Sequence, residues 1–190
     1  NVYKKLVEQK LSVATPLFNL GFKCPSEGVT ENLKNQVLDE IVCEIIAGEM
    51  TPLYRRMYDA GIINATFDSE IMAGRDYMCV IFSGESHEPE RVADEIRAEI
   101  TRICKEGIDQ KTFELARRAT YGRYVGMYAR TESVAGLMTT AYFAGIEDIY
   151  SLLDIVANAT LEQITNRLKK AFDPEKSALS IIRPIDGEED

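Results

Sequence analysis

The amino-acid sequence predicts an α+β fold, in which a mostly antiparallel sheet packs against helices on one of its faces. Apolar residues recur at helical spacing in long segments bounded by capping residues. Short runs rich in β-favouring residues stand near the start, in the middle and at the end of the chain. Strands gathered in one sheet with segregated helices bury both kinds of apolar face, and 190 residues suffice for a single domain, 1–190.

The first part of the chain predicts a strand followed by two helices. Residues 12–23, "SVATPLFNLGFK", are typical of a strand, and Pro16 favours an edge position for it. Thr30 is expected to cap a helix that ends at Gly48 in a left-handed conformation. A Thr-Pro start signal then predicts a short helix over 52–60.

The remainder predicts a hairpin, a run of helices and a last strand. Strand-like residues 62–71 and 76–84 are joined by a turn in which Gly74 can adopt a positive φ. The second of these strands is apolar on both faces, which is typical of a strand covered on both sides. The helices are expected at 89–107, 110–128, 131–143, 149–158 and 161–172, and the last strand at 176–184.

Charge and composition narrow the classes of function. Lys and Arg number 22 against 31 Asp and Glu, and the net charge of −9 disfavours nucleic acid and anionic membranes as partners. The sequence shows neither a long apolar run nor a signal peptide, so we expect a cytoplasmic protein. Because the chain opens without methionine and closes on an acidic tail, we expect a fragment of a longer protein. The four cysteines lie among apolar neighbours and are expected to be reduced, mostly buried thiols.

Few residues are candidates for catalysis. His87 is the only histidine, so a metal site built from paired histidines cannot form within this chain. Four carboxylates are expected on the polar, solvated side of their helix: Glu31, Asp39, Glu40 and Glu44. The stretch 117–130 alternates arginines and tyrosines, which is typical of rings packed under long arginine stems and, given the acidic chain, less so of nucleic-acid stacking.

Four segments carry a resemblance to a known family. They are "AGEMTPLYRRMYDAGII", "VIFSGESHEPERVADEI", "EGIDQKTFELARRATYGRY" and "TLEQITNRLKKAFDPEKSALSIIRP". In order and spacing they resemble the pitrilysin/insulysin and mitochondrial processing peptidase family of zinc metallopeptidases, from about Leu11 to Pro184. The resemblance implies a clam-shaped endopeptidase of two halves, each made of two α+β domains, with zinc held by an H-x-x-E-H motif in the first domain.

The absence of that motif here makes the chain similar to the C-terminal, zinc-less domain of such a protein. The resemblance therefore implies no catalytic and no metal-binding residue in this chain, and zinc in the N-terminal half of the parent protein. It also implies three partners: that N-terminal half, a peptide substrate, and a homologous partner subunit or a second copy.

The resemblance also bears on substrate binding. Members of the family carry an Arg and a Tyr near the segment equivalent to 76–91 that bind the substrate backbone. The Arg position falls at Met78 or Cys79 here, and no Tyr stands between Tyr77 and Tyr121, so the pair is not carried over. A partner subunit is expected to supply that clamp. Within this chain, the expected substrate-binding residues are Ser83, Glu85 and His87.

Three functions stay open at the level of sequence. The first is the non-catalytic C-terminal domain of a zinc metalloendopeptidase, which forms a wall of the reaction chamber and holds extended peptide by strand addition. The second is a scaffold or assembly subunit of the same fold without protease activity. The third is an independent binding module. An H-x-x-E-H motif in the preceding half would distinguish the first from the second.

Overall fold

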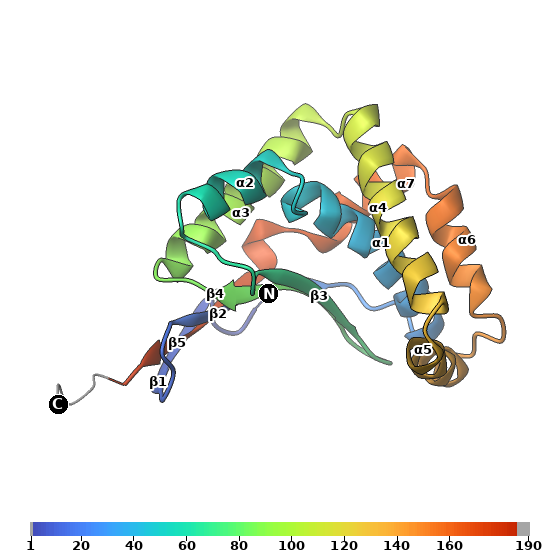
Figure 1. The fold of residues 1–190 in the computed structure, drawn as a ribbon, viewed down its shortest axis with the longest axis horizontal. Coiled ribbons are helices and arrows are strands. Elements are labelled where there is room, and N and C mark those ends of the chain that lie inside the picture. Colours follow the sequence, from blue (N-terminus) through green and yellow to red (C-terminus); the bar gives the residue numbers. More distant parts are fainter. Residues whose placement is uncertain (1, 186–190) are drawn as a thin grey trace.

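A five-stranded mixed sheet carries the helices on one of its faces (Figure 1). The computed structural model describes residues 2–185. The strands are β1 (Leu6–Leu11), β2 (Leu17–Cys24), β3 (Asp68–Ala73), β4 (Met78–Glu85) and β5 (Ser177–Pro184), in the order β1-β5-β2-β4-β3. Only the β1–β5 pair is parallel among the pairs of this sheet, so the predicted α+β fold with a mostly antiparallel sheet is confirmed.

Seven α-helices occupy the described part of the chain. They are α1 (Val29–Ala47), α2 (Pro52–Asp59), α3 (Pro89–Glu106), α4 (Gln110–Tyr128), α5 (Thr131–Phe143), α6 (Tyr150–Asn158) and α7 (Leu161–Ala171). All but α5 lie above the sheet in Figure 1, and α5 lies at the lower right, beyond the end of β3. None of the helices within residues 2–185 has the length and apolar composition that crossing a bilayer requires.

Alternation along the strands places the core between the sheet and the helices. In β2 the even-numbered side chains Phe18, Leu20 and Phe22 are at most 1% exposed, whereas the odd-numbered ones face away from the helices. The Phe22 ring meets the ring of Phe82 in β4 edge to face, with 6.1 Å between centroids. The middle of α1 covers this layer with fully buried Val37 and other aliphatic side chains.

The strand β1 is absent from the sequence prediction, and the predicted edge position of β2 is also wrong. All six side chains of β1 are exposed, so its apolar pattern is weak. Because β4 and β5 pair with β2 on its two sides, β2 is the central strand, and the edge position predicted from Pro16 is wrong. Pro16 precedes the first residue of β2, where no ladder donor is needed, and its carbonyl accepts a hydrogen bond from the Ser86 N–H.

Several local signals are confirmed, and three are wrong. Thr51 caps α2, and Thr160 forms the full capping box of α7 with Gln163. Helix α1, however, begins before Thr30, whose hydroxyl instead donates to the carbonyl of Ala144. Gly48 is extended rather than left-handed, and Gly74 is not among the glycines with positive φ.

The second face of the sheet, here called the open face, carries no helix. Its members from β4 are half-buried, so the expectation that this strand is covered on both sides is wrong. The open face consists of Val7, Gln9, Leu11, Leu17, Asn19, Gly21, Lys23, Asp68, Glu70, Met72, Cys79, Ile81, Ser83, Ala178, Ser180, Ile182 and Pro184. Apolar side chains make up much of it, and Val7, Leu11 and Met72 are 40%, 46% and 43% exposed.

Gly84 permits a close backbone approach at the end of β4. A Cβ at this position would lie 3.0 Å from the Cα of Phe67 and 3.3 Å from its nitrogen, and backbone cannot move aside as a side chain can. We expect Gly84→Ala to lower the free energy of unfolding by about 1–3 kcal/mol. Gly21→Ala is the matched control, because its nearest heavy atom is 4.0 Å away. Urea denaturation of both variants measures the difference, and equal stabilities would contradict the expectation.

Candidate functional site

The residues predicted to bind substrate do not form one site. Glu85 and His87 line a shallow hollow of about 430 Å³ at the end of β4, and Asn64 Nδ2 donates to Glu85 Oε2 over 2.9 Å. Ser83 does not line this hollow, because it lies on the open face opposite Asp68 of β3. The substrate-binding role of the three residues stays a prediction.

Two further groups of residues bear on the chemistry. Within residues 2–185, no three His, Cys, Asp or Glu side chains stand close enough together to hold a metal ion. Cys24 and Cys43 are buried, and burial raises the pKa of both thiols, to about 12 for Cys24. Cys79 is half-buried and Cys104 is exposed, so burial holds for only part of the predicted set. All four are free thiols.

A concave groove lies beside the edge strand β3. It has a volume of about 770 Å³ and lies between β3, α1 and the middle of α4. Cys43 and Ala47 of α1 contribute apolar floor, together with Phe67 and Ile71 at the strand. We call this site the β3 groove.

The β3 groove borders the edge of the sheet, where some backbone N–H and C=O groups of β3 point away from β4. Gly74 N–H donates to the Tyr77 carbonyl, and this pair closes the β3–β4 turn. Along an antiparallel ladder, pairs that exchange hydrogen bonds alternate with pairs that do not. Counted from the Gly74–Tyr77 pair, Ser69, Ile71 and Ala73 fall in pairs of the second kind, so their N–H and C=O groups point away from β4. The Ser69 N–H instead donates to its neighbour Asp68 Oδ1 over 2.7 Å, which agrees with that direction.

The β3 groove is acidic. Five carboxylates line it, and Arg123 is the one base among its lining residues. Arg123 Nη1 lies 3.3 Å from Glu44 Oε2, and Tyr124 donates its hydroxyl to Glu40 Oε1 over 3.2 Å. Burial raises the pKa of Glu40, and the nearby Arg123 opposes this effect. Glu40 and Glu44 are half-buried, so their predicted place on a fully solvated helix side is wrong.

Asp39 precedes Glu40 in α1. The prediction that Asp39 is exposed is also wrong, because its side chain is more deeply buried than that of Glu40. The Asp39 side chain is fully buried in an ion pair with Arg167 of α7, whose side chain is 6% exposed. Arg167 donates from Nε to Oδ1 over 2.7 Å and from Nη2 to Oδ2 over 2.5 Å. The two-point contact fixes α7 against α1 and therefore holds the helix that forms one wall of the β3 groove.

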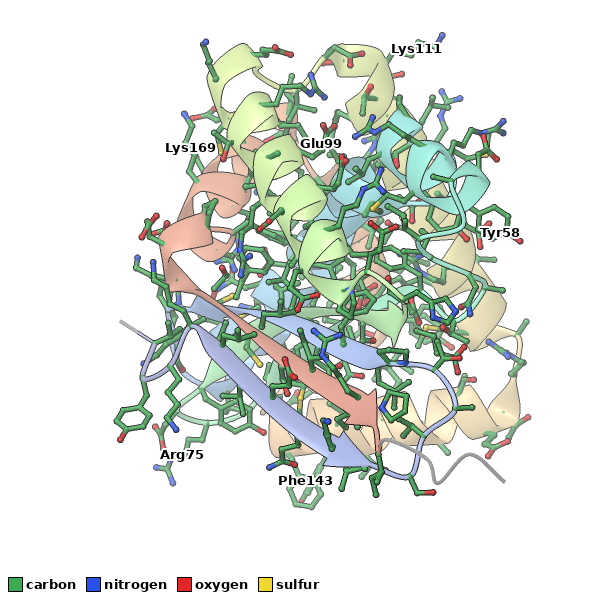
Figure 2. All side chains as sticks on the ribbon, turned by 90° about the vertical axis from the view of Figure 1, so that its left-hand side faces the viewer. Tyr58, Arg75, Glu99, Lys111, Phe143 and Lys169 are labelled. Carbon is green, nitrogen blue, oxygen red and sulfur yellow. The ribbon has the colours of Figure 1, made fainter. Side chains whose placement is uncertain are left out.

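Residues of the tyrosine-rich stretch in α4 have unequal roles. Tyr124 is buried against α1, Tyr128 donates its hydroxyl to the Ile149 carbonyl over 2.6 Å, and Tyr121 is 40% exposed. The rings of Tyr124 and Tyr128 thus pack within the helix layer, whereas their predicted packing under arginine stems stays a prediction. Arg75, in the turn after β3, points away from the body of the molecule (Figure 2).

Similar proteins identify the family. The family model described as peptidase M16 inactive domain matches residues 3–120. The uncharacterized zinc protease YmfH of Bacillus subtilis (strain 168) is 24% identical over 185 residues, which are 96% of this chain and 43% of that protein. The chain thus spans less than half the length of this relative.

Solved structures share the fold. An M16-like protein from Alicyclobacillus acidocaldarius superimposes with a TM-score of 0.86 at 18% identity, over 95% of this chain and 44% of that one. The inactive peptidase domain of a candidate zinc protease from Bordetella parapertussis superimposes with a TM-score of 0.75 at 15% identity, over 96% of this chain and 97% of that one. Since the matching family model covers more than half of the chain, this protein belongs to the family of peptidase M16 inactive domains.

Proposed function

We propose that this chain is the non-catalytic C-terminal domain of a zinc metalloendopeptidase and forms one wall of its reaction chamber. The proposal rests on one observation: this chain belongs to a family of inactive peptidase domains and is similar to less than half of a zinc protease. The chain contains one histidine, whereas H-x-x-E-H requires two. The zinc site of the parent protein therefore lies outside these 190 residues, in an N-terminal half that binds this domain.

The open face and α5 are the surfaces that suit such a partner half. Apolar side chains on the open face have no helix above them, and burying them against another domain is favourable at about 25 cal/mol per Å². Helix α5 exposes Met138, Tyr142 and Phe143 at 56%, 79% and 76%. Phe143 projects away from the rest of the molecule in Figure 2. Both surfaces support docking of the N-terminal half on the side of the sheet that lacks helices.

The test is zinc content and cleavage of a fluorogenic peptide by the full-length parent, with the 190-residue chain as the control. We expect the parent to hold zinc and to cleave, and the isolated chain to do neither. Cleavage by the isolated chain that depends on metal would contradict the proposal. A parent without zinc and without cleavage, also in the presence of its partner subunit, would instead favour a scaffold role for the same fold.

A further inference from the structure

We propose that a second groove, in the helix layer, binds an amphipathic helix of a partner protein whose apolar stripe is flanked by lysine or arginine. The groove has a volume of about 740 Å³ and lies where α3 ends and α4 begins, beside the end of α1 and the start of α2. We call it the α3–α4 groove. The turn that joins α3 to α4 lies at the top of Figure 1, far from the sheet. The site is therefore separate from the open face, on which the proposed function relies.

The floor of the α3–α4 groove is apolar. Ile45 of α1, Ile103 of α3 and Ala116 of α4 line it, and each is 4% exposed. Met50, in the turn between α1 and α2, also lines the groove and is 78% exposed. A methionine side chain is flexible and adapts to apolar ligands of varied shape. Covering this surface with apolar side chains removes it from water, which favours a complex.

The rim of the α3–α4 groove is acidic. Four carboxylates and one guanidinium group, that of Arg102, line it. Arg102 forms ion pairs with both Glu99 and Glu106, so its single charge is shared between two acids. A further acid of the rim, Glu44, pairs with Arg123 over 3.3 Å. Even with this second arginine the acids are in excess, so the rim attracts a cationic ligand and repels an acidic one.

The helix starts beside the groove do not offer a site for an anion. The starts of α2 and α4 carry partial positive charges, but Thr51 and Asp109 cap them with their own side-chain oxygens. Hydrogen bonds from Thr112 lower the pKa of Asp109, which therefore keeps its negative charge at neutral pH. Lys111 does not line the groove, and it projects outward from α4 in Figure 2. Both the rim and the helix starts thus agree in favouring a cation.

The walls of the groove favour a helix over an extended peptide. Every residue that lines it belongs to a helix or to a turn between helices, so no strand edge is present to bind peptide backbone. A helix satisfies its own backbone N–H and C=O groups and presents apolar side chains three and four residues apart on one face. Such a stripe fits the apolar floor, and lysine or arginine beside it would reach the acidic rim.

The first experiment uses the 190-residue chain, since a similar inactive domain has been solved as a chain of nearly the same extent. The probe is a fluorescein-labelled peptide of about 18 residues, with leucines three and four positions apart and lysine and alanine elsewhere. Fluorescence anisotropy follows its binding to the chain. We expect saturable binding, and binding at least about tenfold weaker when glutamate replaces lysine in the peptide. A central proline, which breaks the helix and keeps the charge, should weaken binding by about the same factor.

Matched variants of the chain locate the binding. Glu106→Lys reverses one charge of the rim, and Met50→Lys places a charge on the apolar surface. Both side chains are exposed, so both variants should fold, and each should weaken binding at least about tenfold. Glu147→Lys and Val125→Lys introduce lysine in place of an acid and of an apolar residue at exposed positions outside the groove. These two controls should change the affinity less than about twofold.

Four results would overturn the inference. The first is equal affinity for the basic peptide and for its acidic or proline form. The second is equal weakening in Glu106→Lys and Glu147→Lys, because the peptide would then respond only to the net charge of −9. The third is weakening in Met50→Lys alone, since Met50 also lines the β3 groove and the peptide would then lie there. The fourth is a dimer of the chain, seen by sedimentation, that Met50→Lys dissociates, because a second copy would then occupy the groove.

Discussion

Replacing Arg167 with methionine is expected to lower the free energy of unfolding by about 3–5 kcal/mol, because Asp39 then lies fully buried without its partner. Two hydrogen bonds at 2.7 and 2.5 Å are lost, and they are the bonds that compensate a carboxylate with no exposed surface. Replacement of both residues, Asp39→Leu with Arg167→Met, is expected to restore most of that stability, since no buried charge is left. Urea denaturation at neutral pH measures all variants, and a double variant as unstable as Arg167→Met would contradict this account.

The pH dependence of the same site has a defined sign. Burial raises the pKa of Asp39 from its ordinary 3.8 to about 6, against the opposing hydrogen bonds from Arg167. A carboxyl with a raised pKa in the folded state takes up a proton on folding, so its contribution to stability is greatest below pH 3.8 and falls as the pH rises to about 6. Without Arg167 that pKa rises further. The stability lost in Arg167→Met should therefore shrink as the pH is lowered.

A lysine placed on the open face is expected to separate the two halves of the parent protein without unfolding this domain. Ile182 of β5 lies on that face opposite Leu17 and is half-buried in the isolated chain. Ile182→Lys should weaken binding of the N-terminal half by about 100-fold, which corresponds to about 2.8 kcal/mol, because docking would bury an unpaired charge. Calorimetric titration of the two separately produced halves gives the affinity, and peptide cleavage by the mixture should fall in parallel.

Leu115→Lys is the matched control for this experiment. Leu115 is 56% exposed on α4, in the helix layer, so the same lysine there adds charge without meeting the proposed interface. We expect it to leave the affinity within about twofold. Loss of affinity in Leu115→Lys with full affinity in Ile182→Lys would move the interface to the helices.

The sequence predicts what is local, and the structure adds what joins distant segments. Caps such as Thr51 and the Thr160 box depend on a few neighbouring residues, and they are confirmed. Strand β1 depends on β5 at the far end of the chain, and its own pattern of side chains is weak. The wrong edge position of the strand that follows Pro16 has a separate cause, because the proline precedes the first residue of β2 and both β4 and β5 pair with that strand.

The candidate site was hidden for the same reason. The sequence pattern around Asp39 predicts a polar helix side, because the partner that buries this residue, Arg167, stands 128 residues later in the sequence. The β3 groove exists because β3 ends the sheet order and α4 packs beside α1, and neither relation is encoded in a short motif. The resemblance to a peptidase family predicts Ser83, Glu85 and His87 as substrate-binding residues, and these lie in the neighbouring strand β4 or beyond its end.

The pairing of the first strand with the last constrains how this domain reaches its native state. Lys5 and Glu175 form an ion pair across 170 residues, and β1 lies against β5 along its whole length. Contacts of such high sequence separation slow folding, and here they cannot form on the ribosome until β5 has emerged. Until then β2 lacks a neighbour on one side, and its unpaired edge is open to other chains. We therefore expect aggregation through the central strand to compete with folding until β5 has been synthesised.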